Sequence, residues 1–593
     1  MTEPIRLVMR NTRGVLAGPF LLLCSVALIP RSTDLTAGEK ECDVAIGRDG
    51  VLSTDSAVAT EVGRAVLAGG GNAVDAAVAV GFAMAVTWPE AGNIGGGGFM
   101  LVAPPGDSEV ACIDYRETAP ASVNEDSFRD WKLRRHARMA GVPGTVRGLE
   151  EAHRRFGSRP WNELLAPAID LAAFGVTVDG PLAESLNAGV EGDELHGAMR
   201  HREFLRTFAH PEKRPWQAGD RLVQRDLAKT LRLIAEDPDE FYRGRVARQI
   251  VAEMRVGEGM ITATDLEDYR AVVRTPVRGT VAGYEVFGPP PPSSGGLTVL
   301  LQLQMLERLS IPRRDQTGGS VRETHLLTET MRRAFRERAA HLGDPDFGDI
   351  NTSAFSPEAA DRYAGLIDAT RATLSDAIAA EIPLTPRVGE SEQTTHFSVL
   401  DAGGMAVSNT YTLEASFGSK VVVRGAGFLL NNEMGDFNWV SGVTNRRGQI
   451  GTRPNLMAPG KRMLSSMSPT IVKEDGEVRL IVGSPGGRTI INTVTQVTAA
   501  HLLAGRDLAK CVTQPRTHHQ WLPDVLFLEG DAAEWPAGFA DELRLLGHDV
   551  QHRPTYRQGS VHAIAVDATG TATAVADWRR GGAAAAVESP PVE

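Results

Sequence analysis

Several short stretches of this sequence combine residue types that could bind an anion or act as a nucleophile. Residues 483–487, Gly-Ser-Pro-Gly-Gly, follow a strand-like run, and such a loop exposes backbone N–H groups that can bind an anion. The loop lacks the lysine of a phosphate-binding P-loop, which argues against nucleotide binding. An ordinary tight turn explains the same residues equally well.

Hydroxyl side chains gather at two further places. Residues 464–468 contain three serines, although loop hydroxyls usually bond only the local backbone. Thr394, Thr395 and His396 open a strand-like run after the polar, proline-containing linker 382–393. A threonine at the head of a strand is most often a simple β-branched strand residue. Spacing alone therefore does not single out a nucleophile.

Metal sites and the common hydrolase motifs receive little support. His518 and His519 could bind a metal, yet no third ligand stands at a recognisable spacing. The sequence contains neither a GxSxG nor an HExxH motif, which argues against an α/β-hydrolase and a zinc protease. No CxxC spacing occurs among the four cysteines, which are Cys24, Cys42, Cys112 and Cys511. We therefore expect no metal site.

The composition describes the scaffold that must position these residues. The 593 residues include 42% hydrophobic and 23% charged side chains, which excludes disorder of the whole chain. The net charge of −12 argues against a nucleic-acid-binding protein, which would show a basic face. Glycine and proline, with 62 and 34 residues, are somewhat enriched. At about 150 residues per domain, the length alone suggests about four domains.

The N-terminal half begins with two helical patterns. Apolar residues recur at helical spacing over 57–66, and Thr54 or Asp55 is available as the cap. Residues 73–86 form a second helix that is apolar nearly all round, which is typical of a helix deep in a large core. A short buried strand is predicted at 99–102.

The character of the chain changes in its last third. Residues 116–384 are mainly helical, with charged faces on segments such as 328–341, and four prolines predict a rigid loop over 288–296. Further on, polar and apolar residues alternate in three antiparallel strand pairs, at 396–413, 470–482 and 561–576. Helices first and strand pairs afterwards indicate an α+β protein with layered sheets.

The first 37 residues predict an export signal and a linker. Arg6, Arg10 and Arg13 precede the uncharged, mostly apolar run 14–29, which is the order of a secretory signal. The run is shorter than the ~20 residues that a membrane-spanning helix needs. We expect a periplasmic or secreted protein, with an uncleaved N-terminal membrane anchor or a misassigned start as the alternatives.

An ordered series of motifs resembles the γ-glutamyltranspeptidases, which are N-terminal-nucleophile hydrolases. The resemblance covers about residue 45 to the C-terminus. Matching stretches lie at 70–77, 93–100, 114–120, 142–146 and 291–296. The densest series is TTHFSVLD (394–401), NTYTLEASFGS (409–419), GFLLNNEMGDF (427–437), LSSMSPT (464–470) and GSPGG (483–487). Any one glycine-rich piece would be weak evidence, but the ordered set is specific.

The resemblance implies a four-layer αββα sandwich made from a precursor that cuts itself. Thr394 would attack the carbonyl of Gln393, and the resulting ester would be hydrolysed to give two chains. The large subunit, 38–393, and the small subunit, 394–593, would pair as one catalytic heterodimer. Cleavage frees the α-amine of the threonine, which can then serve as the general base for its own hydroxyl. An α-amine has a pKa near ~7.7–8.0, close to working pH.

The family's motifs also imply roles for individual residues. The residues that would carry the reaction are Thr394, Thr412, Gly486 and Gly487, the last two as an oxyanion hole. Those that would bind the α-carboxylate of a γ-glutamyl group are Arg116, Ser465 and Ser466. Those that would bind its α-ammonium are Glu414, Glu433 and Asp436. Glu414 stands where the family often has asparagine, and Gly435 replaces a common acid. Residues 438–461 are long enough to form the family's lid, but 440–461 contain no aromatic residue, so the usual aromatic gate is missing and Trp439 is its candidate substitute.

The implied function is a γ-glutamyltransferase and glutathione hydrolase without metal or cofactor. Thr394 would take the γ-glutamyl group from glutathione or a similar amide and pass it to water, an amino acid or a peptide. One alternative is an acylase for glutaryl or cephalosporin-type amides, whose substrates lack the ammonium that Glu414, Glu433 and Asp436 would meet. A non-catalytic secreted binding protein on the same scaffold is the other.

Overall fold

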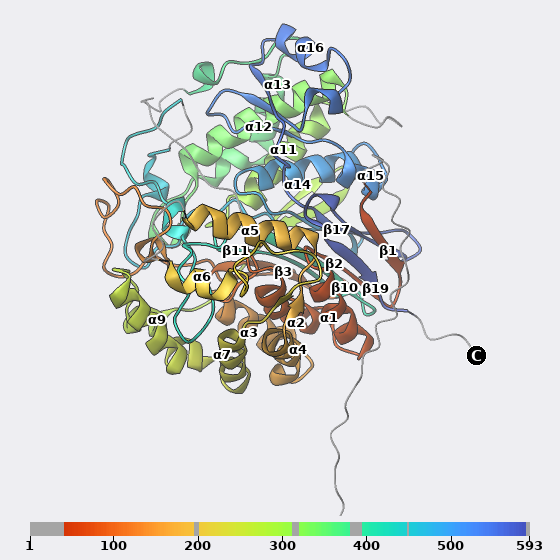
Figure 1. Cartoon of the computed structure of the whole chain (residues 1–593). Coiled ribbons are helices and arrows are strands. Elements are labelled where there is room, and N and C mark those ends of the chain that lie inside the picture. Colours follow the sequence, from red (N-terminus) through yellow and green to blue (C-terminus); the bar gives the residue numbers. More distant parts are fainter. Residues whose placement is uncertain (1–40, 195–200, 311–318, 380–393, 447–449, 589–593) are drawn as a thin grey trace, which may run out of the picture. The chain divides into compact units, whose positions relative to one another are not determined.

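Two seven-stranded antiparallel sheets face each other in the computed structural model, and helices cover their outer faces (Figure 1). The structure describes residues 41–194, 201–310, 319–379, 394–446 and 450–588. The segment Glu41–Glu593 forms one compact unit, so the expectation of about four domains is wrong. The predicted four-layer α+β arrangement is confirmed.

Sheet 1 contains two of the predicted strand pairs. Its strands, in spatial order, are β1 (Asp43–Gly47), β18 (Ala572–Ala576), β17 (His562–Val566), β13 (Glu477–Gly483), β12 (Thr470–Glu474), β9 (Tyr284–Gly288) and β8 (Val277–Val281). The predicted pairs 470–482 and 561–576 are β12–β13 and β17–β18. β8 and β9 lie within a region that the sequence indicated as mainly helical.

Sheet 2 contains the third predicted pair and the strand that follows Thr394. Its strands, in spatial order, are β19 (Ala583–Ala586), β2 (Gly50–Thr54), β10 (Thr395–Asp401), β11 (Ala406–Thr412), β3 (Gly97–Ala103), β4 (Ala111–Asp114) and β7 (Val272–Arg274). β10 and β11 are central and fully paired. The core of the molecule therefore holds both ends of this strand pair in place.

The helices on sheet 2 begin with the two patterns seen in the sequence. α1 (Ala57–Ala68) packs on β2, and its cap is the Ser56 hydroxyl rather than Thr54 or Asp55. α2 (Ala73–Thr87) packs on β10 and β11, and every one of its residues is buried. Its uniform apolarity is explained by this position, because α1, α3 (Thr145–Phe156) and α4 (Trp161–Phe174) surround its other sides.

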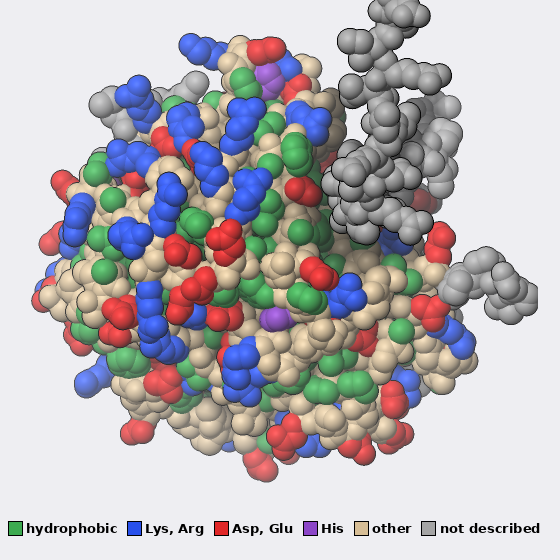
Figure 2. Space-filling view, turned by 90° about the horizontal axis from the view of Figure 1, so that it is seen from below, with side chains coloured by type: hydrophobic (Ala, Val, Ile, Leu, Met, Phe, Trp, Pro, Cys, Tyr) green, Lys and Arg blue, Asp and Glu red, His purple; other side chains and the backbone are tan. Residues whose placement is uncertain are grey.

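Smaller elements complete this half of the structure. They are β5 (Val176–Thr177), α5 (Gly180–Glu194), α6 (Arg202–Phe208), β6 (Arg221–Leu222), α7 (Arg225–Glu236), α8 (Asp239–Tyr242), α9 (Arg245–Val256) and α10 (Ala263–Asp268). Viewed from the side of α4 and α7, the surface carries lysines and arginines with acids between and beside them (Figure 2). These helices thus present charged outer faces to solvent.

The helices on sheet 1 include one whose charges are buried. α11 (Gly295–Arg308) packs on β8 and β9, and the last two residues of the predicted rigid loop 288–296 belong to this helix. α12 (Val321–His341) packs on α11 and on the C-terminal part of the chain. The expectation of a charged face over 328–341 is wrong for most of its charged residues, since Glu329, Arg332, Arg333, Glu337 and Arg338 are buried.

The remaining elements lie around α12 and α14. They are α13 (Pro357–Gly365), α14 (Thr489–Leu502), α15 (Leu508–Thr513), α16 (Phe539–Leu545) and the three-stranded sheet β14 (Thr517–His518), β15 (Leu526–Glu529) and β16 (Val550–Arg553). His518 and His519, considered above as metal ligands, bond Asn492 and Asp524 here. Within the described residues, no helix combines the length and apolarity that crossing a membrane would require.

Candidate active site

A cavity of about 580 Å³ brings together most of the residues that the sequence indicated. Its lining includes Thr394, Thr412, Gly487, Arg116, Glu414, Glu433, Asp436, Ser465 and Ser466. Gly486 precedes a lining residue but does not itself line the cavity. Gln393 lies outside the described residues, so the predicted cleavage between Gln393 and Thr394 stays a prediction.

Thr394 is held at the point where β10 and β11 meet the cavity. It directly precedes β10, and Thr412 is the last residue of the neighbouring strand β11. The Thr394 hydroxyl donates to the Thr412 hydroxyl at 3.3 Å, and the Thr412 oxygen also accepts the N–H of Glu414 at 2.8 Å. The Thr394 side chain is buried apart from its cavity face, with a residue exposure of 4%.

The glycines at 95–98 allow the loop before β3 to pack closely against Thr412, the last residue of β11. Asn93 donates its amide N–H to the Thr412 carbonyl at 3.0 Å. A Cβ at Gly96 would lie 1.9 Å from that carbonyl oxygen, well inside any contact distance. Only glycine therefore lets the loop pass against Thr412.

A buried polar network that no sequence motif indicated lies behind Thr394. Asp55 accepts hydrogen bonds from the hydroxyls of Thr395 and Ser560, both at 2.7 Å, and contacts the His562 ring at 2.9 Å. Burial would raise the pKa of the Asp55 carboxyl, but His562 and the Arg580 guanidinium outweigh it and hold the pKa below its ordinary value.

Arg580 connects this network to the residue at the cavity. Its guanidinium donates to the Thr394 carbonyl at 2.9 Å. The backbone of Thr394 is thus fixed on one side by Arg580 and on the other by the start of β10. Asp55, considered above only as a helix cap, and Arg580 are positioning residues that come from opposite ends of the chain.

The glycine pair lies in the loop between β13 and α14. Gly486 and Gly487 have φ angles of +129° and +56°, a backbone region that side chains disfavour. A Cβ at Gly486 would also lie 2.6 Å from the Thr489 hydroxyl oxygen. The loop precedes the first turn of α14, where backbone N–H groups and the helix dipole favour negative charge. This arrangement suits an oxyanion.

Arg116 is buried at the other side of the cavity among carboxyl groups. Its guanidinium nitrogens lie 2.7 Å from a Glu433 oxygen and 2.5 Å from an Asp436 oxygen, with Glu117 at 3.4 Å. Arg116 and Glu433 are close enough for an ion pair but form no hydrogen bond. Neither carboxyl oxygen of Glu433 has a hydrogen-bond partner within the described residues. One arginine is thus shared by three acids.

Three of the carboxyl groups on this side of the cavity have raised pKa values. Burial raises the pKa of Glu117 to about 7, and burial together with Asp436 raises that of Glu414 to about 8. Burial also raises the pKa of Glu433 well above its ordinary value, against the pull of Arg116. A cation that entered this side of the cavity would be attracted by carboxyls that lack enough positive partners.

The two serines lie beside a second buried arginine. The Ser466 hydroxyl oxygen accepts a hydrogen bond from Arg338 of α12 at 2.9 Å. The Ser465 carbonyl accepts the Ser294 hydroxyl at 2.6 Å and the Ser294 N–H at 2.8 Å. Arg338 lines the cavity, although its place in a charged helix segment gave no sign of this.

Comparison with known proteins places these features in one family. The family model described as Gamma-glutamyltranspeptidase matches residues 59–587. The chain belongs to the γ-glutamyltranspeptidase family. It is 43% identical over 510 residues to the glutathione hydrolase proenzyme of Escherichia coli K12, covering 84% of this chain and 85% of that one. The identity to the glutathione hydrolase proenzyme of Pseudomonas aeruginosa is 41% over 534 residues, covering 88% and 92%.

Solved structures support the family assignment and also include an acylase. The γ-glutamyltranspeptidase of Helicobacter pylori matches with a TM-score of 0.51 at 34% identity, covering 56% of this chain and 96% of that one. A cephalosporin acylase from Bacillus halodurans matches with a TM-score of 0.81 at 25% identity, covering 95% and 100%. The fold is therefore shared by enzymes with both kinds of name.

In this γ-glutamyltranspeptidase-family chain, aromatic and basic residues line the outer part of the cavity. Trp439 lines it, and the Arg134 guanidinium lies 4.4 Å from the centre of the Trp439 ring. Phe128 packs beside the Trp439 ring at 5.4 Å between centres. Trp131, which the sequence analysis did not consider, also lines the cavity. Trp439, the candidate substitute for the family's aromatic gate, therefore lies at the cavity, and its action as a gate stays a prediction.

Proposed function

We propose that this chain is a self-processing γ-glutamyltransferase and glutathione hydrolase that uses Thr394 as its nucleophile. The observation that carries the proposal is the position of Thr394. Its hydroxyl lies 3.3 Å from that of Thr412, at the wall of a cavity that combines carboxyls with arginine and serine. The names of the relatives, glutathione hydrolase proenzymes, support both the reaction and the processing.

Processing would proceed by an acyl shift at the Gln393–Thr394 bond. The Thr394 hydroxyl attacks the Gln393 carbonyl, the C–N bond breaks as the C–O ester forms, and the proton goes to the new amine. Water then hydrolyses the ester and releases the two subunits. The freed amine lies in the same residue as the hydroxyl and serves as its base. The Arg580 contact to the Thr394 carbonyl keeps the residue in place after the cut.

Turnover would use the same hydroxyl against a γ-glutamyl amide. The Thr394 oxygen attacks the γ-carbonyl, its proton passes to the α-amine, and the N–H groups of Gly486 and Gly487 receive the negative charge on oxygen. The proton then goes to the leaving amine as the C–N bond breaks. Water or an acceptor amine resolves the ester. Loss of one oxyanion donor typically costs ~10²–10³ in rate.

The acids favour γ-glutamyl donors over glutaryl or cephalosporin-type amides. A γ-glutamyl group carries an α-ammonium, which would favour the ionised form of Glu414 and Glu433 and pair with these carboxylates and with Asp436. A glutaryl group has no cation and would leave those carboxyls without a partner, at a cost in binding. Wild-type enzyme should therefore cleave γ-glutamyl-p-nitroanilide faster than glutaryl-p-nitroanilide. Faster cleavage of the glutaryl compound would reverse this choice in favour of an acylase.

The decisive experiment tests the nucleophile. Thr394→Ala should remain one full-length chain on denaturing electrophoresis and should release no p-nitroaniline from the γ-glutamyl donor. Thr394→Ser is the matched control, because it keeps the hydroxyl and should still give two chains and activity. Normal processing of Thr394→Ala would show that another residue is the nucleophile. A wild-type protein that stayed intact and inactive would favour the non-catalytic binding protein.

We also propose that the protein is exported and that its acceptors are amino acids or peptides. The basic segment before the apolar run 14–29 supports export. N-terminal sequencing of the large subunit after cell fractionation tests this: a start after the run in an exported fraction is expected. Full-length large subunit in the cytoplasmic fraction would contradict it. Adding a dipeptide acceptor should accelerate p-nitroaniline release, because it competes with water for the ester.

A further inference from the structure

The buried carboxylate of Asp55 connects two parts of the active site that distant stretches of the chain supply. Asp55 lies between β2 and α1, and its exposure is 2%. Its Oδ2 accepts the Thr395 hydroxyl at 2.7 Å. Its Oδ1 accepts the Ser560 hydroxyl at 2.7 Å and lies 2.9 Å from Nε2 of His562. Both carboxylate oxygens are therefore bound by groups of the protein.

The hydrogen bonds of His562 indicate that both of its ring nitrogens donate. The Ser53 hydroxyl donates to the Val575 carbonyl at 2.9 Å, so its oxygen accepts from Nδ1 of His562 at 2.8 Å. Nε2 faces Asp55, whose pKa lies below its ordinary value and which therefore only accepts. Asp55 and His562 thus form a buried ion pair. Hydrogen bonds between charged groups are stronger than neutral ones, so this pair is a firm anchor.

On one side, the anchor holds the strand that begins at the nucleophile. Thr395 is the first residue of β10 and directly follows Thr394. Successive side chains of a strand point to opposite faces. Because the Thr395 hydroxyl is bound to Asp55 behind the strand, the Thr394 side chain is directed to the cavity, which it lines.

On the other side, the same anchor reaches the glycine loop between β13 and α14. The Ser560 N–H donates to the Ser484 hydroxyl oxygen at 3.1 Å, and this hydroxyl donates to the Pro485 carbonyl at 2.8 Å. Both serines are fully buried, and Pro485 directly precedes Gly486. The place of the glycine N–H groups therefore depends on Ser560 and, through its hydroxyl, on Asp55.

We propose that Asp55 is a positioning residue that sets the nucleophile and the oxyanion loop at the right distance from each other, because it bonds the supports of both. The reaction needs the Thr394 oxygen and the glycine N–H groups at fixed places around one carbonyl group. The inference deepens the proposed function and rests on its assignment of Thr394, Gly486 and Gly487. Asp55 touches neither the substrate nor the reacting atoms and takes no proton in the reaction.

Asp55→Asn is the first test. The amide has one oxygen and one NH₂ group, so a donor would face the hydroxyl donor of either Thr395 or Ser560. For the mature variant, kcat with γ-glutamyl-p-nitroanilide should fall about 10- to 100-fold, the size expected for a misplaced reacting group. KM should stay within about threefold of wild type, because the groups that meet the α-carbon are unchanged. A wild-type kcat would refute the role of Asp55.

Thr395→Val and Ser560→Ala test the two arms of the connection separately. Each removes one hydroxyl that donates to Asp55 and should lower kcat by about 3- to 10-fold. In the Asp55→Asn background, either change should alter kcat by less than about twofold, since the connection is already broken. Losses that multiplied in full in that background would show that Thr395 and Ser560 act without Asp55, against the proposal.

Asp75→Asn is the matched control. Asp75 is also fully buried, and it accepts the hydroxyl of Ser158 at 2.6 Å and the N–H of Ser158 at 2.9 Å. It belongs to the first turn of α2 and lies outside the lining of the cavity. This variant should lose thermal stability and keep the wild-type kcat. An equal loss of kcat in both variants would contradict the proposal, because any loosening of the core would then have the same effect.

The outcomes separate this inference from the proposed function. A wild-type protein that is cut into two chains but does not cleave γ-glutamyl-p-nitroanilide refutes the proposed substrate only. The rate of processing during cell-free translation then replaces kcat, and Asp55→Asn should process about 10- to 100-fold more slowly. A wild-type protein that is neither cut nor active refutes both. If Asp55→Asn does not mature, Thr395→Val and Ser560→Ala decide: a lower kcat at unchanged KM supports the role, and a wild-type kcat in both refutes it.

Discussion

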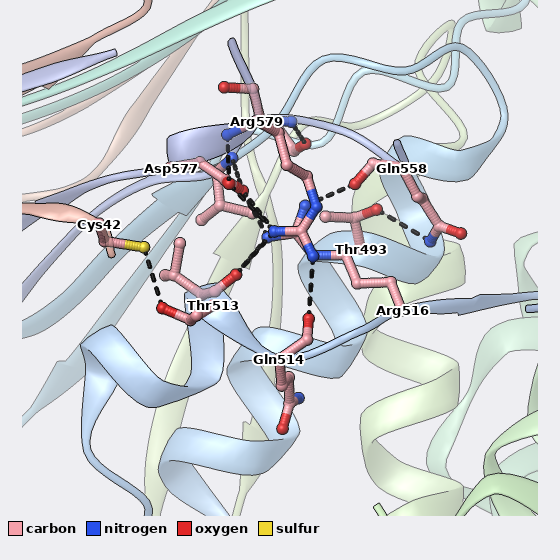
Figure 3. A network of polar contacts seen from close by, with 12 residues as sticks. Cys42, Thr493, Thr513, Gln514, Arg516, Gln558, Asp577 and Arg579 are labelled. Carbon is pink, nitrogen blue, oxygen red and sulfur yellow. Dashed lines mark hydrogen bonds and ion pairs between the residues drawn. The ribbon is translucent and has the colours of Figure 1, made fainter. Parts of the chain in front are cut away.

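Two buried clusters of arginine and carboxylate differ in how well their charges match. In the first, Arg516 and Arg579 converge on Asp577, with contacts of 2.5 and 3.0 Å (Figure 3). Arg579 also lies 2.6 Å from Glu529, so two arginines meet two carboxyls. These charges hold the pKa of Asp577 at about 2 against the effect of its burial. This matched cluster is complete without a ligand.

The second cluster lines the cavity and is not matched. Arg116 faces Glu117, Glu433 and Asp436, and Glu414 lies nearby, where Arg134 and Arg135 also act on it. Glu117, Glu414 and Glu433 have raised pKa values, whereas Asp577 in the matched cluster has a lowered one. Burial is common to both clusters, so the difference lies in the ratio of charges. A matched cluster serves stability, and an unmatched one is completed by a ligand.

The largest expected effect comes from breaking the matched cluster. Asp577→Asn would leave two buried arginines with one carboxyl and should lower the free energy of unfolding by about 3–5 kcal/mol. Denaturant unfolding of the mature protein measures this loss. KM for γ-glutamyl-p-nitroanilide should stay within about twofold of wild type in the folded fraction. A large KM change without a stability loss would mean that the two clusters are not separate.

The next effect comes from removing one acid of the unmatched cluster. Glu433→Gln takes away a carboxyl that is costly to ionise, so stability should be unchanged or higher. The α-ammonium loses a charged partner, and kcat/KM for γ-glutamyl-p-nitroanilide should fall about 10- to 100-fold. Glutaryl-p-nitroanilide, which has no ammonium, should be cleaved as fast as before or faster. An equal loss on both donors would argue that Glu433 only supports the fold.

The residues at the cavity and in the polar network behind it differ in how far the sequence could predict them. Thr394, Thr412 and Gly487 lie within contiguous motifs, and the strand pair that carries the two threonines follows directly from alternating residues. Arg338 could not be predicted, because its segment has the charge spacing of a solvent-exposed helix and is buried only by α11 and its neighbours. Asp55 and His562 are 507 residues apart, and only the pairing of strands from both ends brings them together.

The pH dependence of stability should separate the clusters by sign. Glu414 has a pKa of about 8 in the folded protein, against an ordinary value of 4.5. Between these two pH values the folded protein keeps the Glu414 proton and the unfolded chain does not. Stability therefore falls as pH rises from about 4.5, where this carboxyl ionises in the unfolded chain, to about 8, where it ionises in the folded protein. Asp577 acts in the opposite direction, because its stabilisation is lost as pH falls through its folded pKa of about 2.

Glu414→Gln sharpens this contrast. Thermal unfolding between pH 5 and 8.5 should show a smaller decline for the variant than for wild type, since one of the raised carboxyls no longer titrates. The remaining decline belongs to Glu117 and Glu433, whose pKa values are also raised. Identical slopes for variant and wild type would show that Glu414 is not a source of the instability.

The smallest effect concerns the cation at the edge of the unmatched cluster. Arg134 lies over the Trp439 ring and helps to hold down the pKa of Glu414, so the ring fixes a positive charge near the acids. A contact of this kind is worth ~0.5–1 kcal/mol at an exposed site. Trp439→Ala should therefore change KM less than about fivefold and raise the ratio of hydrolysis to transfer, because water reaches the ester more easily. Trp439→Phe keeps a ring face for Arg134, so its KM and its ratio of hydrolysis to transfer should lie between those of wild type and Trp439→Ala. If Trp439→Ala instead lowered kcat/KM as much as Glu433→Gln, the edge of the cavity, and not the surplus of acid, would control binding of the ammonium.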